Sequence, residues 1–146
     1  MKWVTRERPK TDRIACPWLI RRFIDPEAEI LYVPKDQVLA VAETHGARAF
    51  DAPHAEFTHR DGKCTFEVLI EDFDLAKKDP ALETLARIVH AADISSDTGS
   101  HPFGAAIEAI GSGGLDAEPD DHRLLERGSF VYDALYAWCE KESLGG

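Results

Sequence analysis

The sequence has few cysteines, no long apolar stretch and no recognisable leader segment. Its three cysteines, Cys16, Cys64 and Cys139, are odd in number and far apart, and none belongs to a Cys-x-x-Cys pair. This pattern argues against a disulfide framework. No apolar run approaches the roughly 18 residues of a membrane-spanning helix, and no charged-then-apolar segment opens the chain. These absences predict a cytoplasmic protein without a membrane segment.

Short catalytic signatures are also missing. The sequence contains no nucleophile elbow, no P-loop, no Gly-x-Gly-x-x-Gly and no His-Glu-x-x-His motif. The Gly-Ser-Gly-Gly run at residues 111–114 follows an expected helix rather than a strand, so it is not typical of a phosphate-binding loop. The chain has 146 residues, of which 44% are hydrophobic and 30% charged, and this composition is typical of a globular protein. We therefore expect residues 1–146 to form a single domain.

Basic residues are in the minority but are concentrated at the start of the chain. There are 17 lysines and arginines against 27 aspartates and glutamates, a net charge of -10. This balance disfavours direct nucleic-acid binding, because phosphate contacts need clustered basic residues. Residues 1–22 nevertheless carry seven basic and two acidic residues. A solvated basic face is one interpretation, and a site for a small anion is the other, since guanidinium groups match oxyanions.

Hydrophobic patterning predicts alternating strands and helices over the first third of the chain. We expect strands over residues 2–8, 29–33 and 48–51, with helices over 12–23 and 36–44 between them. Pro17 indicates either that the first helix begins nearer Cys16 or that it kinks. Gly46 is expected to end the second helix. Two crossovers of this length favour a small parallel sheet in the order β-α-β-α-β.

The remaining two-thirds of the sequence is predicted to be helical. We expect helices over residues 66–73, 80–93, 102–110 and 122–142, with a hairpin or loop over 56–65 and a polar loop over 95–100. The glycine run at 111–114 is expected to end the third of these helices. The aromatic stripe on the last helix is expected in the core; it comprises Phe130, Tyr132, Tyr136 and Trp138. The predicted fold class is therefore α/β, with a small three-stranded parallel sheet packed against a helical C-terminal part.

The first candidate site is a set of three arginines, Arg6, Arg8 and Arg13. Arg6 and Arg8 point to the same face of an extended strand, and Arg13 lies in the first turns of the following helix. Small anions bind in α/β folds where a strand ends and a helix begins. These arginines are therefore candidate ligands of an oxyanion. The alternative is that they pair with Glu7, Asp12 or the acidic body of the protein.

The second candidate site is a metal site made by His59, Glu67, His90 and Asp93. His90 and Asp93 are three residues apart and share one helix face, and the donor set suits zinc, iron or manganese. The alternative is that His90 interacts with the end of its helix.

Cys16 is a third candidate, as a redox-active thiol. It lies beside Pro17 in the basic segment, where positive charge and a helix N-terminus would lower its pKa. The alternative is a small buried apolar residue.

Three segments resemble a known family. They are residues 3–23 (WVTRERPKTDRIACPWLIRRF), residues 58–67 (THRDGKCTFE) and residues 131–139 (VYDALYAWC). The sequence resembles, from residue 3 to residue 139, the C-terminal domain family of the chromate-resistance protein ChrB. The resemblance implies a role in chromate resistance. In this family the domain occurs as part of a chromate-responsive regulator, on its own, or fused to a sulfurtransferase-like module.

The chain begins at the first of these motifs, so we expect a stand-alone domain without the preceding DNA-binding region. Chromate is a tetrahedral dianion shaped like sulfate, and Arg6, Arg8 and Arg13 all lie in the first motif. The leading hypothesis is therefore an oxyanion-binding domain of chromate resistance, with His59 as an added donor or metal ligand near the anion. The alternatives are a metal-dependent enzyme and a module that binds a sulfurtransferase-like partner, a regulator or a second copy of itself.

Overall fold

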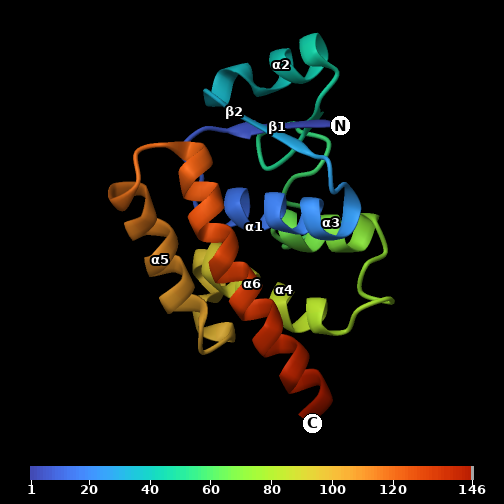
Figure 1. Ribbon diagram of the computed structural model, residues 1–146, viewed down its shortest axis with the longest axis vertical. Coiled ribbons are helices and arrows are strands. Elements are labelled where there is room, and N and C mark those ends of the chain that lie inside the picture. Colours follow the sequence, from blue (N-terminus) through green and yellow to red (C-terminus); the bar gives the residue numbers. More distant parts are fainter. Residues whose placement is uncertain (146) are drawn as a thin grey trace.

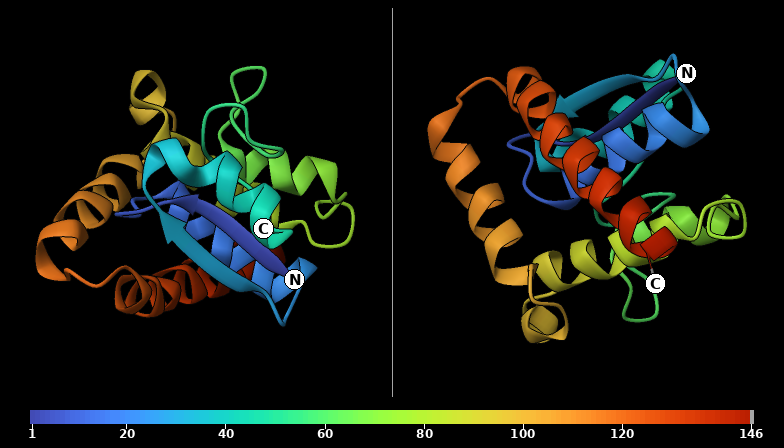
Figure 2. Two further views of the ribbon diagram at one scale, coloured as in Figure 1. Left: turned by 90° about the horizontal axis from the view of Figure 1, so that it is seen from above. Right: turned by 60° about the horizontal axis from the view of Figure 1, so that its bottom comes forward.

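The computed structural model describes residues 1–145 and contains a parallel sheet with helices on both of its faces (Figures 1 and 2). The strands are β1 (Lys2–Arg6), β2 (Glu29–Val33) and β3 (Arg48–Ala49), and their order is β2-β1-β3. Trp3 in the central strand is paired with Ile30 on one side and Arg48 on the other. The predicted α/β class and the three-stranded parallel sheet are confirmed.

Alternate side chains of β1 point to opposite faces of the sheet and enter different cores. Trp3 lies in the main hydrophobic core with residues of the later helices. Val4 packs on the other face in a smaller cluster with Val38 of α2 (Val38–His45). A short 3-10 turn, η2 (Lys35–Gln37), precedes α2, and Gly46 follows it with a left-handed φ of 61°. Gly46 therefore ends this helix as the sequence predicted.

The first helix continues through Pro17. It consists of α1 (Asp12–Leu19) followed by a π-helical segment, η1 (Ile20–Ile24), so it does not begin near Cys16. Proline has no amide proton to donate to the carbonyl of Arg13. Tyr32 of β2 donates its hydroxyl to that carbonyl at 2.8 Å. The sheet thus satisfies the group that Pro17 leaves without its helical partner.

The later part of the described chain is helical, and α6 crosses both α1 and α4 (Figure 1). The region between β3 and α3 is an irregular loop with a tight turn at Arg60 to Lys63. The segment after α4 is a 3-10 helix, η3, where the sequence suggested a loop. The elements are α3 (Thr65–Asp72), α4 (Ala81–Asp93), η3 (Ser95–Ser100), α5 (Gly104–Ala117) and α6 (Asp121–Gly145).

The expectation that residues 111–114 end a helix was wrong, because α5 runs through them to Ala117. Close packing explains two of the three glycines, Gly111 and Gly114. A Cβ atom on Gly111 would lie 3.0 Å from Thr11 Oγ1, and one on Gly114 would lie 3.2 Å from Leu124 of α6. Larger residues at these two positions would push α5 away from its neighbours. This packing requirement outweighs the low helix propensity of glycine.

The expectation for the aromatic stripe of α6 was half right. Tyr132 and Tyr136 are buried, whereas Phe130 is 72% exposed and Trp138 is 38% exposed. At about 100° per residue, Phe130 and Tyr132 lie about 200° apart around the helix, so they cannot share one face. Within residues 1–145, no helix combines the length and apolar character needed to cross a membrane.

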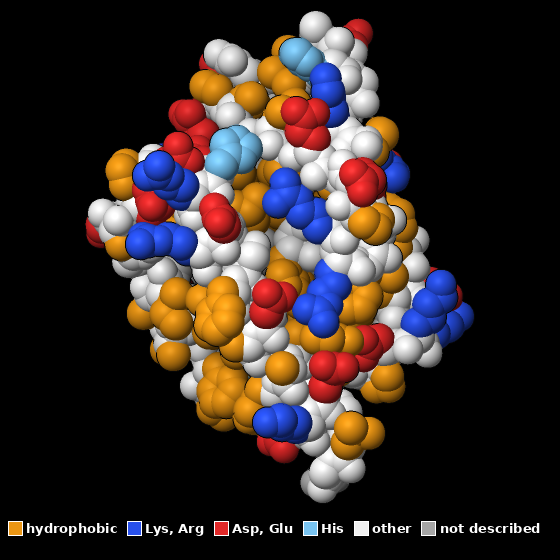
Figure 3. Space-filling view, in the orientation of Figure 1, with side chains coloured by type: hydrophobic (Ala, Val, Ile, Leu, Met, Phe, Trp, Pro, Cys, Tyr) orange, Lys and Arg blue, Asp and Glu red, His pale blue; other side chains and the backbone are white. Residues whose placement is uncertain are grey.

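On the molecular face shown in Figure 3, acidic, basic and apolar side chains are interspersed. Two of the basic side chains in the N-terminal segment are held in ion pairs across the fold. Lys10 contacts Glu108 of α5 at 2.7 Å, and Arg22 contacts Asp133 of α6 at 3.1 Å. The excess positive charge of this segment is therefore offset by carboxylates from the C-terminal helices.

Candidate functional site

A polar cavity of about 170 Å³ lies where β1 and β3 end and α1 begins. The carboxyl ends of parallel strands are the usual location of binding sites in α/β folds. Its charged side chains come from four segments: the end of β1 and start of α1, the segment that follows β3, the loop before α3 and the end of α4. The lining residues are Arg6, Lys10, Thr11, Arg13, Asp51, His59, Ala92 and Asp93.

Two buried carboxylates lie at the base of this region, and both are held by the start of α3. Asp12, 1% exposed, accepts hydrogen bonds from the backbone amides of Thr65 at 2.8 Å and Phe66 at 3.2 Å. Asp51, 5% exposed, accepts a hydrogen bond from the hydroxyl of Thr65 at 2.7 Å. Asp12 begins α1 but satisfies the free amides at the N-terminus of α3. It therefore fixes the position of α3 relative to α1.

His59 brings three carboxylates together. Its Nε2 atom lies 3.1 Å from Asp93 Oδ2, 3.4 Å from Asp51 Oδ1 and 3.5 Å from Asp12 Oδ2. The close carboxylates of Asp12, Asp51 and Asp93 raise the pKa of His59 well above its ordinary value, against the opposing effect of burial. The imidazole is therefore protonated at neutral pH when these carboxylates are its only partners.

The two aspartates respond differently to this environment. Burial raises the pKa of Asp12 despite its hydrogen bond with His59, and the charges of Asp51 and Asp93 raise it further. Burial acts in the same direction on Asp51. There it is outweighed by hydrogen bonds from His59 and Thr65 and by the nearby arginines, so the pKa of Asp51 is lowered.

Arg6 and Arg13 reach the same cavity from β1 and α1. Arg6 donates from Nε to the carbonyl of Asp51 at 2.8 Å and from Nη2 to its carboxylate at 3.3 Å. Arg13 Nε lies 3.6 Å from that carboxylate, and Arg13 Nη1 donates to the carbonyl of Glu7 at 3.0 Å. Burial and the charge of Arg6 lower the pKa of the Arg13 guanidinium. Two of the three arginines singled out in the sequence therefore meet, with Asp51 between them.

Arg8 lies elsewhere, because the chain turns after β1 and Arg8 has a left-handed φ of 54°. Its side chain donates hydrogen bonds to three carbonyls at the end of α5 and to Asp121 at the start of α6. It does not line the polar cavity. The period-two alternation that placed Arg8 beside Arg6 ends with β1 at Arg6.

The four predicted metal ligands fall into two separate groups. His59 and Asp93 belong to the cavity, whereas His90 faces away from it. Nδ1 of His90 contacts Glu67 Oε1 at 2.5 Å, and its Nε2 contacts Asp97 at 2.7 Å. Glu67 also accepts a hydrogen bond from the amide of Cys64 at 3.0 Å, at the start of α3.

Cys16 is buried within α1 and has the opposite electrostatics from those expected for a redox thiol. Burial, followed by the nearby charge of Asp12, raises the pKa of Cys16 well above its ordinary value. Its Sγ lies 3.7 Å from Asp12 Oδ1. The structure thus corrects the expectation that the basic segment lowers this pKa.

Comparison with known proteins finds matches along nearly the whole chain. Residues 3–139 match the family described as "ChrB, C-terminal domain". The chain belongs to the ChrB C-terminal domain family. It is similar to "Protein ChrB" of Cupriavidus metallidurans, with 36% identity over 135 residues. That match covers 92% of this chain and 40% of the relative. No solved structure matches the chain.

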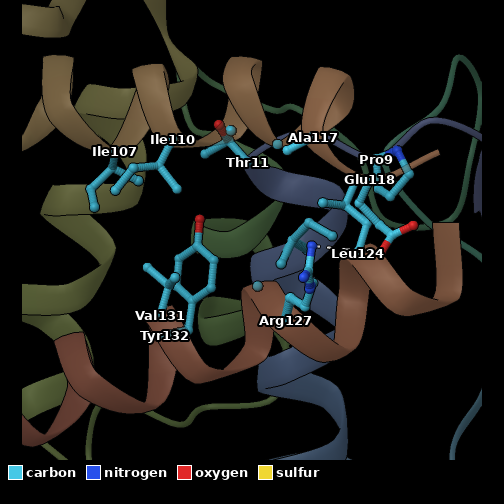
Figure 4. A pocket seen from close by; sticks show the side chains of 14 residues that line it. Pro9, Thr11, Ile107, Ile110, Ala117, Glu118, Leu124, Arg127, Val131 and Tyr132 are labelled. Carbon is cyan, nitrogen blue, oxygen red and sulfur yellow. Dashed lines mark ion pairs between the residues drawn. The ribbon is translucent and has the colours of Figure 1, made fainter. Parts of the chain in front are cut away.

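A second cavity, of about 180 Å³, lies between α5 and α6 and is mainly apolar (Figure 4). Ile107 and Ile110 enter it from α5, and Tyr132 points into it from α6. The charged residues on its wall, Arg127 and Glu118, lie 3.6 Å apart as an ion pair. Of these two cavities the polar one is the better candidate for a binding site, because arginine, aspartate and histidine side chains line it and the other is mainly apolar.

Sequence reasoning did not select two carboxylates that surround His59, namely Asp51, which lines the cavity, and Asp12, which is buried beside it. Asp12 was considered as the start of a helix and as a partner of the arginines, and Asp51 only as the end of a strand. The usable signal was the topology itself. Asp51 follows β3, and parallel strands present the residues after their carboxyl ends at one edge of the sheet.

Proposed function

We propose that this chain acts in chromate resistance by binding a small tetrahedral oxyanion, chromate or a sulfate-like anion, in the polar cavity. The carrying observation is the pair of arginines in the lining. Arg6 and Arg13 both reach the cavity and share the single carboxylate of Asp51. These two cations meet in one cavity of a chain whose net charge is -10. Membership of the ChrB C-terminal domain family supports the link to chromate resistance.

The size of the cavity suits a small guest. About 170 Å³ corresponds to the volume of roughly five or six water molecules. A tetrahedral oxyanion has five covalently bonded heavy atoms and needs less space than five or six separate waters, so it fits in the cavity together with part of that water.

The arginines supply the geometry that such an anion needs. Asp51 contacts Arg6 at 3.3 Å and Arg13 at 3.6 Å, so it holds the two guanidinium groups near each other without using all of their donors. The side chains of Arg6 and Arg13 are 30% and 17% exposed. A dianion bound between them would relieve the repulsion between these two partly buried cations and gain charge-assisted hydrogen bonds.

Titration with sulfate, the unreactive analogue of chromate, tests the proposal. We expect sulfate in chelator-treated buffer of constant ionic strength to raise the melting temperature. We expect Arg6→Ala and Arg13→Ala to weaken its binding by about tenfold or more, measured by calorimetry. Arg87→Ala is the matched control, because Arg87 is exposed on α4 away from the cavity. Equal sulfate affinity in the wild type and in both cavity variants would overturn the proposal.

A further inference from the structure

We propose a divalent metal site at the base of the polar cavity, formed by Asp12, Asp51 and His59 with Asp93 as the fourth ligand. The metal-binding atoms of Asp12, Asp51 and His59 all lie within 4.8 Å of one another. Asp93 Oδ2 is 3.1 Å from His59 Nε2. The four residues come from α1, the segment after β3, the loop before α3 and the end of α4, so the fold brings them to one point.

The distances agree with those between ligands that share one ion. Metal–ligand bonds of about 2.1 Å separate neighbouring ligand atoms by about 3.0 Å at octahedral angles and about 3.4 Å at tetrahedral angles. The three carboxylate oxygens lie 3.1, 3.4 and 3.5 Å from His59 Nε2. A single N–H group cannot donate well-directed hydrogen bonds to three oxygens at once. An ion bound by the deprotonated nitrogen would satisfy all three oxygens together.

The surroundings hold these ligands in orientation. Thr65 donates its amide to Asp12 and its hydroxyl to Asp51, so one residue at the start of α3 positions both carboxylates. The oxygens that Thr65 contacts, Asp12 Oδ2 and Asp51 Oδ1, are those that face His59 Nε2, and each has a further lone pair for an ion. Hydrogen bonds that orient ligating carboxylates are characteristic of metal sites. The cavity above the carboxylates, about 170 Å³, provides access and space for water or an anion as a further ligand.

The other group with metal-binding potential, Cys64, Glu67 and His90, is a weaker candidate. Both ring nitrogens of His90 already contact carboxylates, Glu67 on one side and Asp97 on the other. Glu67 also accepts the hydrogen bond from the amide of Cys64 at the start of α3. Burial raises the pKa of the Cys64 thiol, which opposes the thiolate that metals prefer. This group is internally satisfied as a structural cluster.

The donor set indicates the class of metal. One imidazole with two or three carboxylates suits Mn²⁺, Fe²⁺ or Zn²⁺, whereas sites for Mg²⁺ and Ca²⁺ use oxygen ligands. The ion would compensate the negative charge of Asp12 and Asp51, which lie away from solvent. Its charge would also strengthen the attraction for an oxyanion held by Arg6 and Arg13, and this last point alone rests on the proposed function.

Titration with Mn²⁺ alone, in buffer free of sulfate and phosphate, tests the site. After treatment with chelator, we expect one Mn²⁺ per chain, detected by calorimetry and by the loss of the free-ion electron paramagnetic resonance signal. His59→Gln and Asp93→Asn should weaken binding by about tenfold or more. His90→Gln is the matched control and should bind Mn²⁺ as the wild type does. Circular dichroism establishes which variants fold, and Asp93→Asn, at the end of α4, removes no hydrogen bond to the start of α3.

Two results would overturn the inference. One is the absence of saturable binding by the wild type up to about 1 mM Mn²⁺. The other is loss of binding in His90→Gln with retention in His59→Gln, which would assign the ion to the other cluster. Binding of Mn²⁺ without any effect of sulfate would support the metal site and contradict the proposed oxyanion function. Sulfate binding in chelator-treated buffer without Mn²⁺ binding would do the reverse.

Discussion

Replacing Arg8 with alanine should destabilise the fold and leave oxyanion binding intact. Arg8 resembles Arg6 and Arg13 in the sequence, but its guanidinium holds the α5–α6 junction. Nη1 donates to the carbonyl of Pro119 at 2.7 Å and to Asp121 at 2.8 Å. Nη2 donates to the carbonyls of Leu115 at 2.6 Å and Glu118 at 3.1 Å. Leu115 lies in the last turn of α5, whose carbonyls lack intrahelical donors, and Glu118 and Pro119 follow the helix.

The magnitude follows from the exposure of the Arg8 side chain. A buried charge-assisted hydrogen bond contributes about 1.5–3 kcal/mol. The side chain is 37% exposed, so water replaces part of each bond and we assign about 0.5–1 kcal/mol to each. Four such bonds give a loss of about 2–4 kcal/mol in the free energy of unfolding. For a domain of this size, that corresponds to a fall in melting temperature of about 6–12 °C.

Differential scanning calorimetry with three variants is the appropriate assay. Arg8→Lys should recover less than half of the loss, because an ammonium group cannot reproduce the planar fork of the guanidinium. Arg87→Ala, which removes an exposed arginine, should change stability by less than about 0.5 kcal/mol. If Arg8→Ala melts with the wild type but binds sulfate less tightly, Arg8 is an anion ligand and the structural role is wrong.

Three further outcomes are expected. The hydrogen bonds of His90 to Asp97 and Glu67 outweigh burial and raise its pKa, so its contribution to stability is present below about pH 6.5 and is lost as pH rises through the raised value. The free energy of unfolding of the wild type, from urea titrations between about pH 6 and pH 9, should therefore fall more steeply than that of His90→Gln; parallel profiles would contradict this. The three thiols are fully buried, so a thiol reagent should label Cys16 and the other two only after unfolding, and rapid labelling of the native protein would show that Cys16 is accessible. Gly128→Ala puts a Cβ 2.7 Å from Ile14 Cγ2 and should lower the free energy of unfolding by about 1–3 kcal/mol. Gly113→Ala meets open space and should raise that free energy by about 0.5–1 kcal/mol. Equal effects of the two substitutions in calorimetry would refute the packing argument.

The fold was predictable wherever local signals and tertiary packing agree. The strand at Glu29–Val33 has the predicted bounds, because an apolar run is closed by Pro34. Gly111 and Gly114 of α5 were misjudged, since their effect depends on how near the segment before α1 and helix α6 approach, and no local pattern contains that distance. The exposure of Phe130 is a different case. A helical projection of the sequence already separates it from Tyr132.

The candidate site was predictable only in part, because its members are brought together over long sequence separations. Arg6 and Arg13 belong to one continuous motif, and the spacing of strand and helix anticipated their convergence. His59 and Asp93 were recognised as suitable donors, but their separation from Glu67 and His90 depends on which faces of α3 and α4 meet. Asp12 was hidden by its local role, since its carboxylate serves the helix that begins 53 residues later.

The crossing of α6 over α1 and α4 determines how the protein can be dissected. Every charged side chain that lines the polar cavity comes from residues 6–93. The helices that carry Asp12 and Asp93, α1 and α4, nevertheless both pack against α6. A fragment ending after α4 would retain all of the chemical groups and lose their spacing. Minimal versions of this domain therefore have to extend through the final helix, although that helix contributes none of the donors.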